Sequence, residues 1–205
     1  MIGPAGRYNG GGSSAATDLL CASITRGGGR NSVAGTACAP AGFPTGRNMD
    51  WAAIDVSNVV WWKFHSTARR DPLLAVIQAV THVPVLCDEL GCERVAFCHD
   101  RAPYKRRQVW PQYKTHRDKH PGEDSSAEDE LRAYIAKIPD YLRLLGYRNV
   151  FARPGYEADD LMWAVRQAVP AGDRLVMVSG DGDLFQLLDG RTASYRPRTG
   201  HGWTP

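Results

Sequence analysis

The sequence predicts an α/β fold in which a parallel sheet is flanked by helices. Four short apolar runs, at residues 52–56, 94–98, 150–152 and 174–178, have the composition of buried strands. Segments with helical periodicity separate these runs, and alternating strands and helices imply parallel pairing in a doubly wound sheet. The length of 205 residues fits one domain with or without a tail.

The helices are predicted from their periodicity and end signals. Residues 72–90 have a helical pattern, but Pro84 is expected to kink or split that helix because proline lacks a backbone donor. A second helix covers residues 131–145 and ends at Gly146, which has the residue type of a C-cap. Further helices are predicted over residues 157–169 and 183–188.

The first 48 residues differ in composition from the rest of the chain. About half of the 21 glycines lie there, and no apolar periodicity is present. Such a segment buries too little surface to offset its backbone entropy, so residues 1–48 are predicted to be a disordered, glycine-rich extension. Residues 49–205 then form the folded domain. A second interpretation makes Met49, just before the first strand, the natural start of the protein.

Composition narrows the class of protein. Hydrophobic residues make up 43% and charged residues 23%, and no apolar run reaches the ~18 uninterrupted residues of a membrane helix. We therefore expect no membrane partner. A net charge of only +3 means that any nucleic-acid affinity must come from a local basic patch. Five cysteines, an odd number, exclude a fully paired disulfide framework and favour a reducing cytoplasm. Their spacing does not fit a zinc site.

Carboxylates follow the predicted strands at the edge of the sheet where active sites form. One further cluster opens a helix at residues 157–160, and the full set is Asp55, Asp100, Glu157, Asp159, Asp160, Asp181 and Asp183. Oxygen ligands select hard cations such as Mg²⁺ or Mn²⁺, and two such ions support phosphodiester hydrolysis. The alternative is structural: helix dipoles favour acids in a first turn, and Asp183 has the residue type of an N-cap.

Residues 101–119 form a strongly basic segment with aromatic residues between the charges. Its cations are Arg101, Lys105, Arg106, Arg107, Lys114, Arg117 and Lys119, and its aromatic residues are Tyr104, Trp110 and Tyr113. Basic groups contact phosphates and aromatic rings stack on unpaired bases, so the pattern favours a clamp for single-stranded nucleic acid. The alternative is a solvated surface loop.

Five motifs, in order, resemble those of the 5′→3′ exonuclease and flap endonuclease family. That family includes the 5′-nuclease domain of bacterial DNA polymerase I and free-standing phage nucleases. Residues 155–160 (GYEADD) resemble its G-x-EADD motif, and residues 178–187 (VSGDGDLFQL) resemble its SGDxDxxQL motif. The segment 54–58 (IDVSN) is similar to the opening DGSN signature, and Asp100 to the acid after the second strand. Arg106, Tyr113, Lys114 and Arg117 match the R…YKxxR segment of the helical arch.

The resemblance implies a PIN-like fold with a basic helical arch, and a metal-dependent nuclease acting on DNA with a 5′ flap or end in replication or repair. It implies two Mg²⁺ or Mn²⁺ ions, with Asp55, Asp100, Glu157 and Asp159 at the first, Asp160 nearby, and Asp181 and Asp183 at the second. Lys105 or Arg106 is expected to stabilise the transition state. DNA contacts are expected from Arg101, Tyr104, Arg107, Tyr113, Lys114 and Arg117. We expect a monomer in the cytoplasm of a bacterium, or of the host if a phage encodes it.

Two departures from the family pattern leave alternatives open. Val56 replaces the glycine that usually follows the first aspartate, which narrows the approach to the scissile phosphate. The chain also ends before the family's helix-hairpin-helix region and its further metal-binding aspartates. It is therefore either a fragment or a reduced protein with an incomplete second metal site. The alternative functions are a catalytically incomplete DNA-binding fragment and a PIN-type ribonuclease.

Overall fold

The computed structural model describes residues 49–67, 71–115, 126–197 and the backbone of 201–203. The predicted extension, residues 1–48, lies outside the described residues. The described elements, in chain order, are β1 (Trp51–Asp55), α2 (Val56–Ser66), α3 (Pro72–Leu90), β2 (Arg94–His99), α4 (Lys105–Val109), α5 (Ser126–Leu144), β3 (Val150–Ala152), α6 (Ala158–Ala168), β4 (Leu175–Val178), the 3-10 helix η2 (Gly182–Leu187), β5 (Thr192–Arg196) and β6 (His201–Trp203).

The six strands form one sheet in the order β3-β2-β1-β4-β5-β6. The first five are parallel, and β6 pairs antiparallel with β5. The prediction of a parallel sheet is confirmed, with β1 between β2 and β4. The sequence analysis did not predict β5 and β6. Strand β5 (TASYR) has no apolar run, although four of its five residues are buried, because it lies beside β4.

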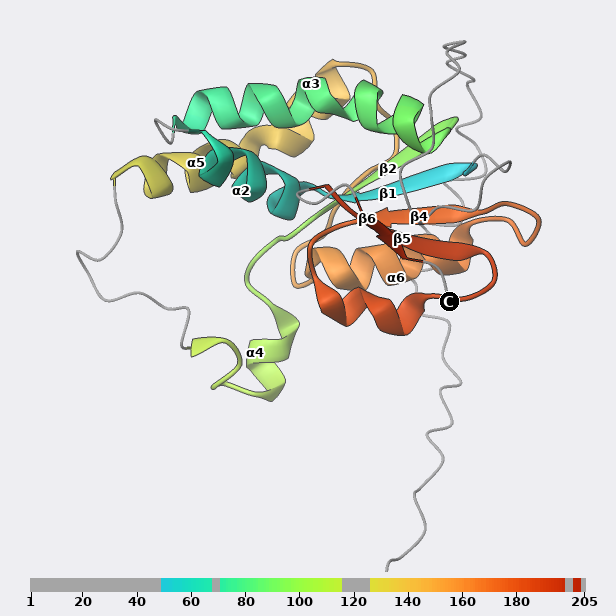
Figure 1. The fold of residues 1–205 in the computed structure, drawn as a ribbon. Helices are drawn as coiled ribbons and strands as arrows, with labels where there is room; N and C mark the ends of the chain where they lie inside the picture. The colour runs from blue at the N-terminus through green and yellow to red at the C-terminus, as the bar shows by residue number, and fades with distance from the viewer. Residues whose placement is uncertain (1–48, 68–70, 116–125, 198–200, 204–205) are drawn as a thin grey trace, which may run out of the picture.

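Helices cover both faces of the sheet, as Figure 1 shows. Helices α2, α3 and α5 pack on one face, where Ile54, Phe97 and Val178 of the sheet meet Phe64, Leu86 and Leu142 of the helices. Helix α6 packs on the other face, where Met162 and Val165 meet Ala53 and Met177. Alternate residues of one strand therefore serve two cores, which explains why β1 is buried at all five positions.

Helix α3 is continuous through Pro84, so of the two expected effects, a kink or a split, the proline does not produce the split. Pro84 lies on the exposed side of the helix, where water can hydrate the carbonyl that loses its partner. By length and composition alone α3 could cross a membrane. Its buried residues, however, pack into the same core as α2 and α5, which is typical of the core helix of a globular domain.

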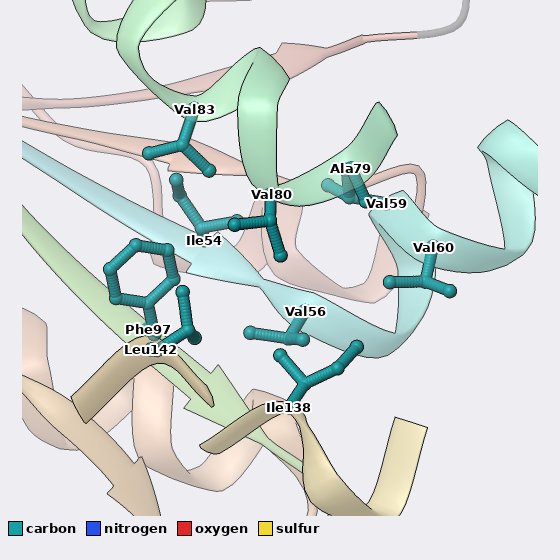
Figure 2. Close-up of a pocket in the computed structure, with 10 residues that line it drawn as sticks. All are labelled: Ile54, Val56, Val59, Val60, Ala79, Val80, Val83, Phe97, Ile138 and Leu142. Carbon is teal, nitrogen blue, oxygen red and sulfur yellow. The ribbon is translucent and has the colours of Figure 1, made fainter. Parts of the chain in front are cut away.

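A small apolar pocket of about 20 Å³ lies between the sheet and its helical cover. Figure 2 shows Ile54 and Phe97 of the sheet facing Val80 and Val83 of α3 and Ile138 of α5 around it. The volume is close to that of one water molecule, and apolar walls offer such a water no hydrogen bonds. The pocket is thus a packing defect of the core and too small for a ligand.

Candidate active site

Asp55 and Asp181 are helix N-caps at the edge of the sheet where β1 and β4 end. Asp55 is the last residue of β1 and the N-cap of α2, where its Oδ1 accepts a hydrogen bond from the Asn58 amide at 3.0 Å. Asp181 follows β4 and is the N-cap of η2, where its Oδ1 accepts from the Asp183 amide at 2.9 Å. The helix predicted from residue 183 is therefore a 3-10 helix that begins at Gly182.

Ser179 joins these two aspartates. Its hydroxyl donates to Oδ2 of Asp55 at 3.0 Å and accepts from the Asp181 amide at 3.1 Å. Asn58 adds a second link, because its side-chain oxygen accepts from the Gly180 amide at 2.8 Å. The loop after β4 is consequently fixed to the start of α2. Neither Ser179 nor Asn58 was predicted as a site residue, although both lie inside the motifs that carry the family resemblance.

The start of α6 brings a second set of acids to this edge. Glu157 is the N-cap of α6, and its amide donates to Oδ2 of Asp160 at 3.0 Å. The next amide, of Ala158, donates to Oδ1 of Asp100 at 2.8 Å, which ties the residue after β2 to the first turn of α6. Glu157 and Asp160 thus lie at the N-terminus of α6, where the helix dipole favours acids, whereas the N-cap of η2 is Asp181 and not Asp183 as the alternative expected.

Four aspartates are close enough to affect one another's ionisation, and we call Asp55, Asp100, Asp159 and Asp181 the acidic cluster. Burial, with further contributions from the charges of Asp100 and Asp159, raises the pKa of Asp55 to about 7, against the hydrogen bonds from Asn58 and Ser179. Burial and the charges of Asp181 and Asp100 raise the pKa of Asp159 to about 6. Both carboxyls are therefore destabilised as anions, and a bound cation would relieve this.

Glu157 has a different environment, because residues of the basic segment contact it. Lys114 Nζ donates to its Oε1 at 2.7 Å, and Tyr113 Oη donates to its Oε2 at 2.8 Å. The Arg106 guanidinium donates to Oε2 of Glu157, to Asp160 and to the Tyr113 hydroxyl. Burial raises the pKa of Glu157, but the bonds from Lys114 and Tyr113 and the charges of Lys114 and Arg106 outweigh it, so the net pKa is lowered.

Of the other residues predicted to bind DNA or to act in catalysis, some lie near the acids and others contact different groups. Lys105 points to Tyr156, whose hydroxyl accepts from its Nζ at 2.9 Å, and its stem lies against Gly155. Arg101 and Lys105 are exposed, whereas Arg107 is half-buried. Tyr104 is near enough to Asp100 and Glu157 that these charges, after burial, raise its pKa. Arg117 lies outside the described residues.

The predicted arch is described only in part. Within residues 101–115 it contains one short helix, α4, followed by Trp110 and the turn that carries Tyr113 and Lys114. In Figure 1, α4 lies apart from the helices that cover the sheet. Its exposed Val109 and Trp110 leave apolar surface available for contact, and Trp110 lies 5.8 Å from the Tyr113 ring.

The donors of this edge fit a hard divalent cation in type and in charge. They are carboxylates, and burial together with neighbouring negative charge raises the pKa of two of them, Asp55 and Asp159. In the described part of the chain, however, no three His, Cys, Asp or Glu side chains already surround a single point. Asp183, a predicted ligand of the second ion, is exposed on η2. The seven predicted ligands therefore share an edge, and they are not gathered into one preformed cage.

Comparison with known proteins defines first the class and then the family. The fold of this chain is similar to that of bacteriophage T5 nucleases of known structure. The bacteriophage T5 5′-exonuclease with bound zinc superposes with a TM-score of 0.63 at 20% identity, over 77% of this chain and 58% of that chain. A complex of the T5 flap endonuclease with DNA and metal ions gives a TM-score of 0.62 at 18% identity, over 76% of this chain and 57% of that one.

Sequence comparison gives the family. The model of the 5′-3′ exonuclease N-terminal resolvase-like domain matches residues 51–202, so the chain belongs to this family. DNA polymerase I of Thermus thermophilus is 30% identical over 142 residues, which are 68% of this chain and 16% of the polymerase. DNA polymerase I of Treponema pallidum is 32% identical over 162 residues, 74% of this chain and 15% of the polymerase. The chain thus spans about one sixth of the length of these relatives.

Proposed function

We propose that this protein is a divalent-metal-dependent, structure-specific 5′ nuclease that hydrolyses phosphodiester bonds of DNA. The single observation that carries the proposal is the acidic cluster at the sheet edge, with Arg106 and Lys114 of the basic segment reaching the neighbouring acids. Family membership supports it, as does the solved complex of a flap endonuclease with DNA and metal ions, which shares the fold.

In the proposed reaction Asp55, Asp100, Asp159 and Asp181 hold Mg²⁺ or Mn²⁺, two ions per site, with Glu157 and Asp160 beside them. Bound there, the metal would activate water and neutralise charge on the phosphate. Ser179 and Asn58 keep Asp55 and the loop of Asp181 in register. Lys114 and Arg106 would supply positive charge where the scissile phosphate gains negative charge in the transition state.

The proposed substrate is DNA with a 5′ single-stranded flap or end. The support is the composition of residues 101–115, where exposed Trp110 and half-buried Tyr113 lie between cations on either side. Aromatic rings between basic groups suit unpaired bases and phosphates, without reading sequence. We further propose a monomer in the cytoplasm, consistent with Cys87, Cys92 and Cys98 all being free thiols.

Cleavage of a labelled 5′-flap tests the proposal. The full chain is incubated with flap DNA and with the same sequence as RNA, in Mg²⁺, in Mn²⁺ and in EDTA. We expect metal-dependent cleavage near the flap junction, none in EDTA, and at least tenfold slower cleavage of RNA. Binding of DNA without cleavage in any metal would contradict the nuclease and favour a DNA-binding protein. Preference for RNA would favour a ribonuclease.

A further inference from the structure

Both carboxylate oxygens of Glu157 are occupied by the basic segment. Lys114 takes Oε1, while Tyr113 and Arg106 share Oε2. Only 7% of the Glu157 side chain is exposed, so water cannot easily add to these contacts. A cation of the acidic cluster that approached Glu157 would therefore meet the positive charges of Lys114 and Arg106 and compete with them for this carboxylate.

The backbone of Lys114 supports the view that these contacts hold the segment in place. Lys114 has a φ of 55°, in the left-handed region that residues with a side chain rarely adopt. Such a conformation persists where surrounding contacts determine it. The contacts that the structure gives Lys114 are the bond to Glu157 and the neighbouring Tyr113 ring, 5.0 Å from its Nζ. Loss of the Glu157 bond would let this turn relax.

The acidic cluster, in contrast, forms no ion pair in the described part of the chain, although the charge of Lys114 also acts on Asp159 and lowers its pKa. Among the described residues no salt bridge reaches Asp55, Asp100, Asp159 or Asp181, and the hydrogen bonds to Asp55 and Asp100 come from backbone amides and Ser179. The cluster thus attracts a cation, while the glutamate beside it is already neutralised by the basic segment.

We propose that Glu157 tethers the basic segment in the cation-free protein, and that a divalent cation bound at the acidic cluster releases Arg106, Tyr113 and Lys114 for the phosphates of DNA. The cation and the basic segment compete for one carboxylate, so each weakens the binding of the other. Glu157 is here a positioning residue for the segment, in addition to its predicted place beside the metal. The proposal rests on the proposed function for the identity of the final partner only.

Hydrogen exchange without DNA tests the release. The amides of residues 104–115 are followed by mass spectrometry in EDTA and in Mg²⁺, using the full chain. In the wild type, Mg²⁺ should speed their exchange at least about threefold, because the tether breaks. Glu157→Gln should exchange fast in both buffers. Unchanged or slower exchange of the wild type in Mg²⁺ would overturn the proposal, and so would a failure of any divalent cation to bind.

Calorimetric titration with Mn²⁺ tests the competition. Tyr113→Phe removes one bond to Glu157 without changing charge, so it should tighten Mn²⁺ binding about three- to tenfold. Lys114→Met should tighten it further. Lys105→Met is the matched control, because Lys105 bonds to Tyr156 and to no carboxylate of the site. Equal affinities for wild type and Tyr113→Phe, or equal gains for Lys105→Met and Lys114→Met, would overturn the tether.

These measurements separate the tether from the proposed function. If the protein cleaves flap DNA but its hydrogen exchange and Mn²⁺ affinities contradict the tether, the proposed nuclease function holds and the proposed tether is wrong. If Mg²⁺ releases the basic segment in a protein that cuts no nucleic acid, the tether holds and the proposed nuclease function is wrong.

Discussion

Single carboxylates at the sheet edge carry more than one function. Asp55 caps α2, accepts a bond from Ser179 and belongs to the acidic cluster, while only 6% of it is exposed. Its neighbour Cys98 has a pKa raised by burial and by the charges of Asp55, Asp100 and Asp159, so this thiol stays protonated and inert. Cation binding and protein stability are therefore linked through the same few groups.

Asp55→Asn should remove a pH-dependent loss of stability. The pKa of Asp55 is about 7 in the folded protein and 3.8 as its ordinary value, so the folded state binds its proton more tightly. The stability that Asp55 contributes is full below pH ~4 and is lost as pH rises through ~7. Without metal, urea unfolding of the wild type should lose about 2–3 kcal/mol from this group between pH 5 and 8. Parallel pH profiles of wild type and variant would contradict the raised pKa.

Asp181→Asn should abolish cleavage and leave the fold intact or more stable. Asp181 raises the pKa of Asp159, so its neutralisation relieves repulsion in the metal-free protein while a proposed metal ligand is lost. We expect at least a hundredfold slower flap cleavage and an unchanged or higher melting temperature. Asp140→Asn, at an exposed carboxylate of α5, is the control. Substantial activity of Asp181→Asn in saturating Mg²⁺ would place Asp181 outside the site.

At the scale of elements, the site depends on junctions between helices and strands. Helix α2 follows β1 without a loop, the N-cap of α6 is Glu157 beside the basic segment, and the N-cap of η2 is Asp181. The link between Asn58 and Gly180 joins the first junction to the last at 2.8 Å. A Cβ at Gly180 would lie 3.1 Å from the Asn58 oxygen, so the approach leaves little room for a side chain.

Asn58→Ala should therefore uncouple the loop of Asp181. The Gly180 amide loses its acceptor, at a cost of about 1–2 kcal/mol, and flap cleavage should fall at least tenfold because Asp181 is no longer held in place. Asn149→Ala is the matched control: its side chain also bonds a backbone group, the Val95 carbonyl at 3.2 Å, but away from the acids. Equal losses of activity at equal losses of stability would show that Asn58 acts on the fold alone.

Val80→Ile should stabilise the protein by filling the apolar pocket. One added methyl group is comparable with the volume of about 20 Å³, and the expected gain is about 0.5–1 kcal/mol. Urea unfolding measures the gain. Val85→Ile, on the exposed side of the same helix, should change stability little. A loss of stability in Val80→Ile would mean that the pocket cannot accept the methyl group without strain.

At the scale of the molecule, the two faces of the sheet have different tasks. The larger core under α2, α3 and α5 holds β1 and β2 in place, and the smaller core under α6 sets the position of Glu157 and Asp159. The acidic cluster lies at the edge of the sheet where the strands end, between the two faces that the helices cover.

A chain that begins at Met49 should keep the cooperative unfolding of the full chain. Residues 1–48 have the glycine-rich, aperiodic composition of a segment that contributes little packing. We expect the melting temperature to stay within ~2 °C and the unfolding transition to keep its width. A clear drop of the melting temperature on deletion would show that the N-terminal residues pack on the domain.

The sequence determined the sheet class and which residue types meet at its edge. Apolar runs followed by acids predicted β1, β2 and β4 and their carboxylates, because parallel strands end together. Motif order predicted the family. The motifs also identified Arg106, Tyr113 and Lys114 as site residues, but they did not predict which groups these side chains contact. Periodicity failed for β5 because its neutral residues are buried by pairing with β4 and not by their own apolarity.

Only the tertiary structure decided how those groups are partnered. Glu157 and Asp159 are two residues apart, yet one is neutralised by the basic segment and the other is half-buried beside further carboxylates. Lys105 and Lys114 look alike in the sequence, and only Lys114 reaches a carboxylate of the site. These differences depend on side-chain direction and on contacts between segments over forty residues apart. Ionisation and ion pairing respond to distance in space, and spacing along the chain does not encode that distance.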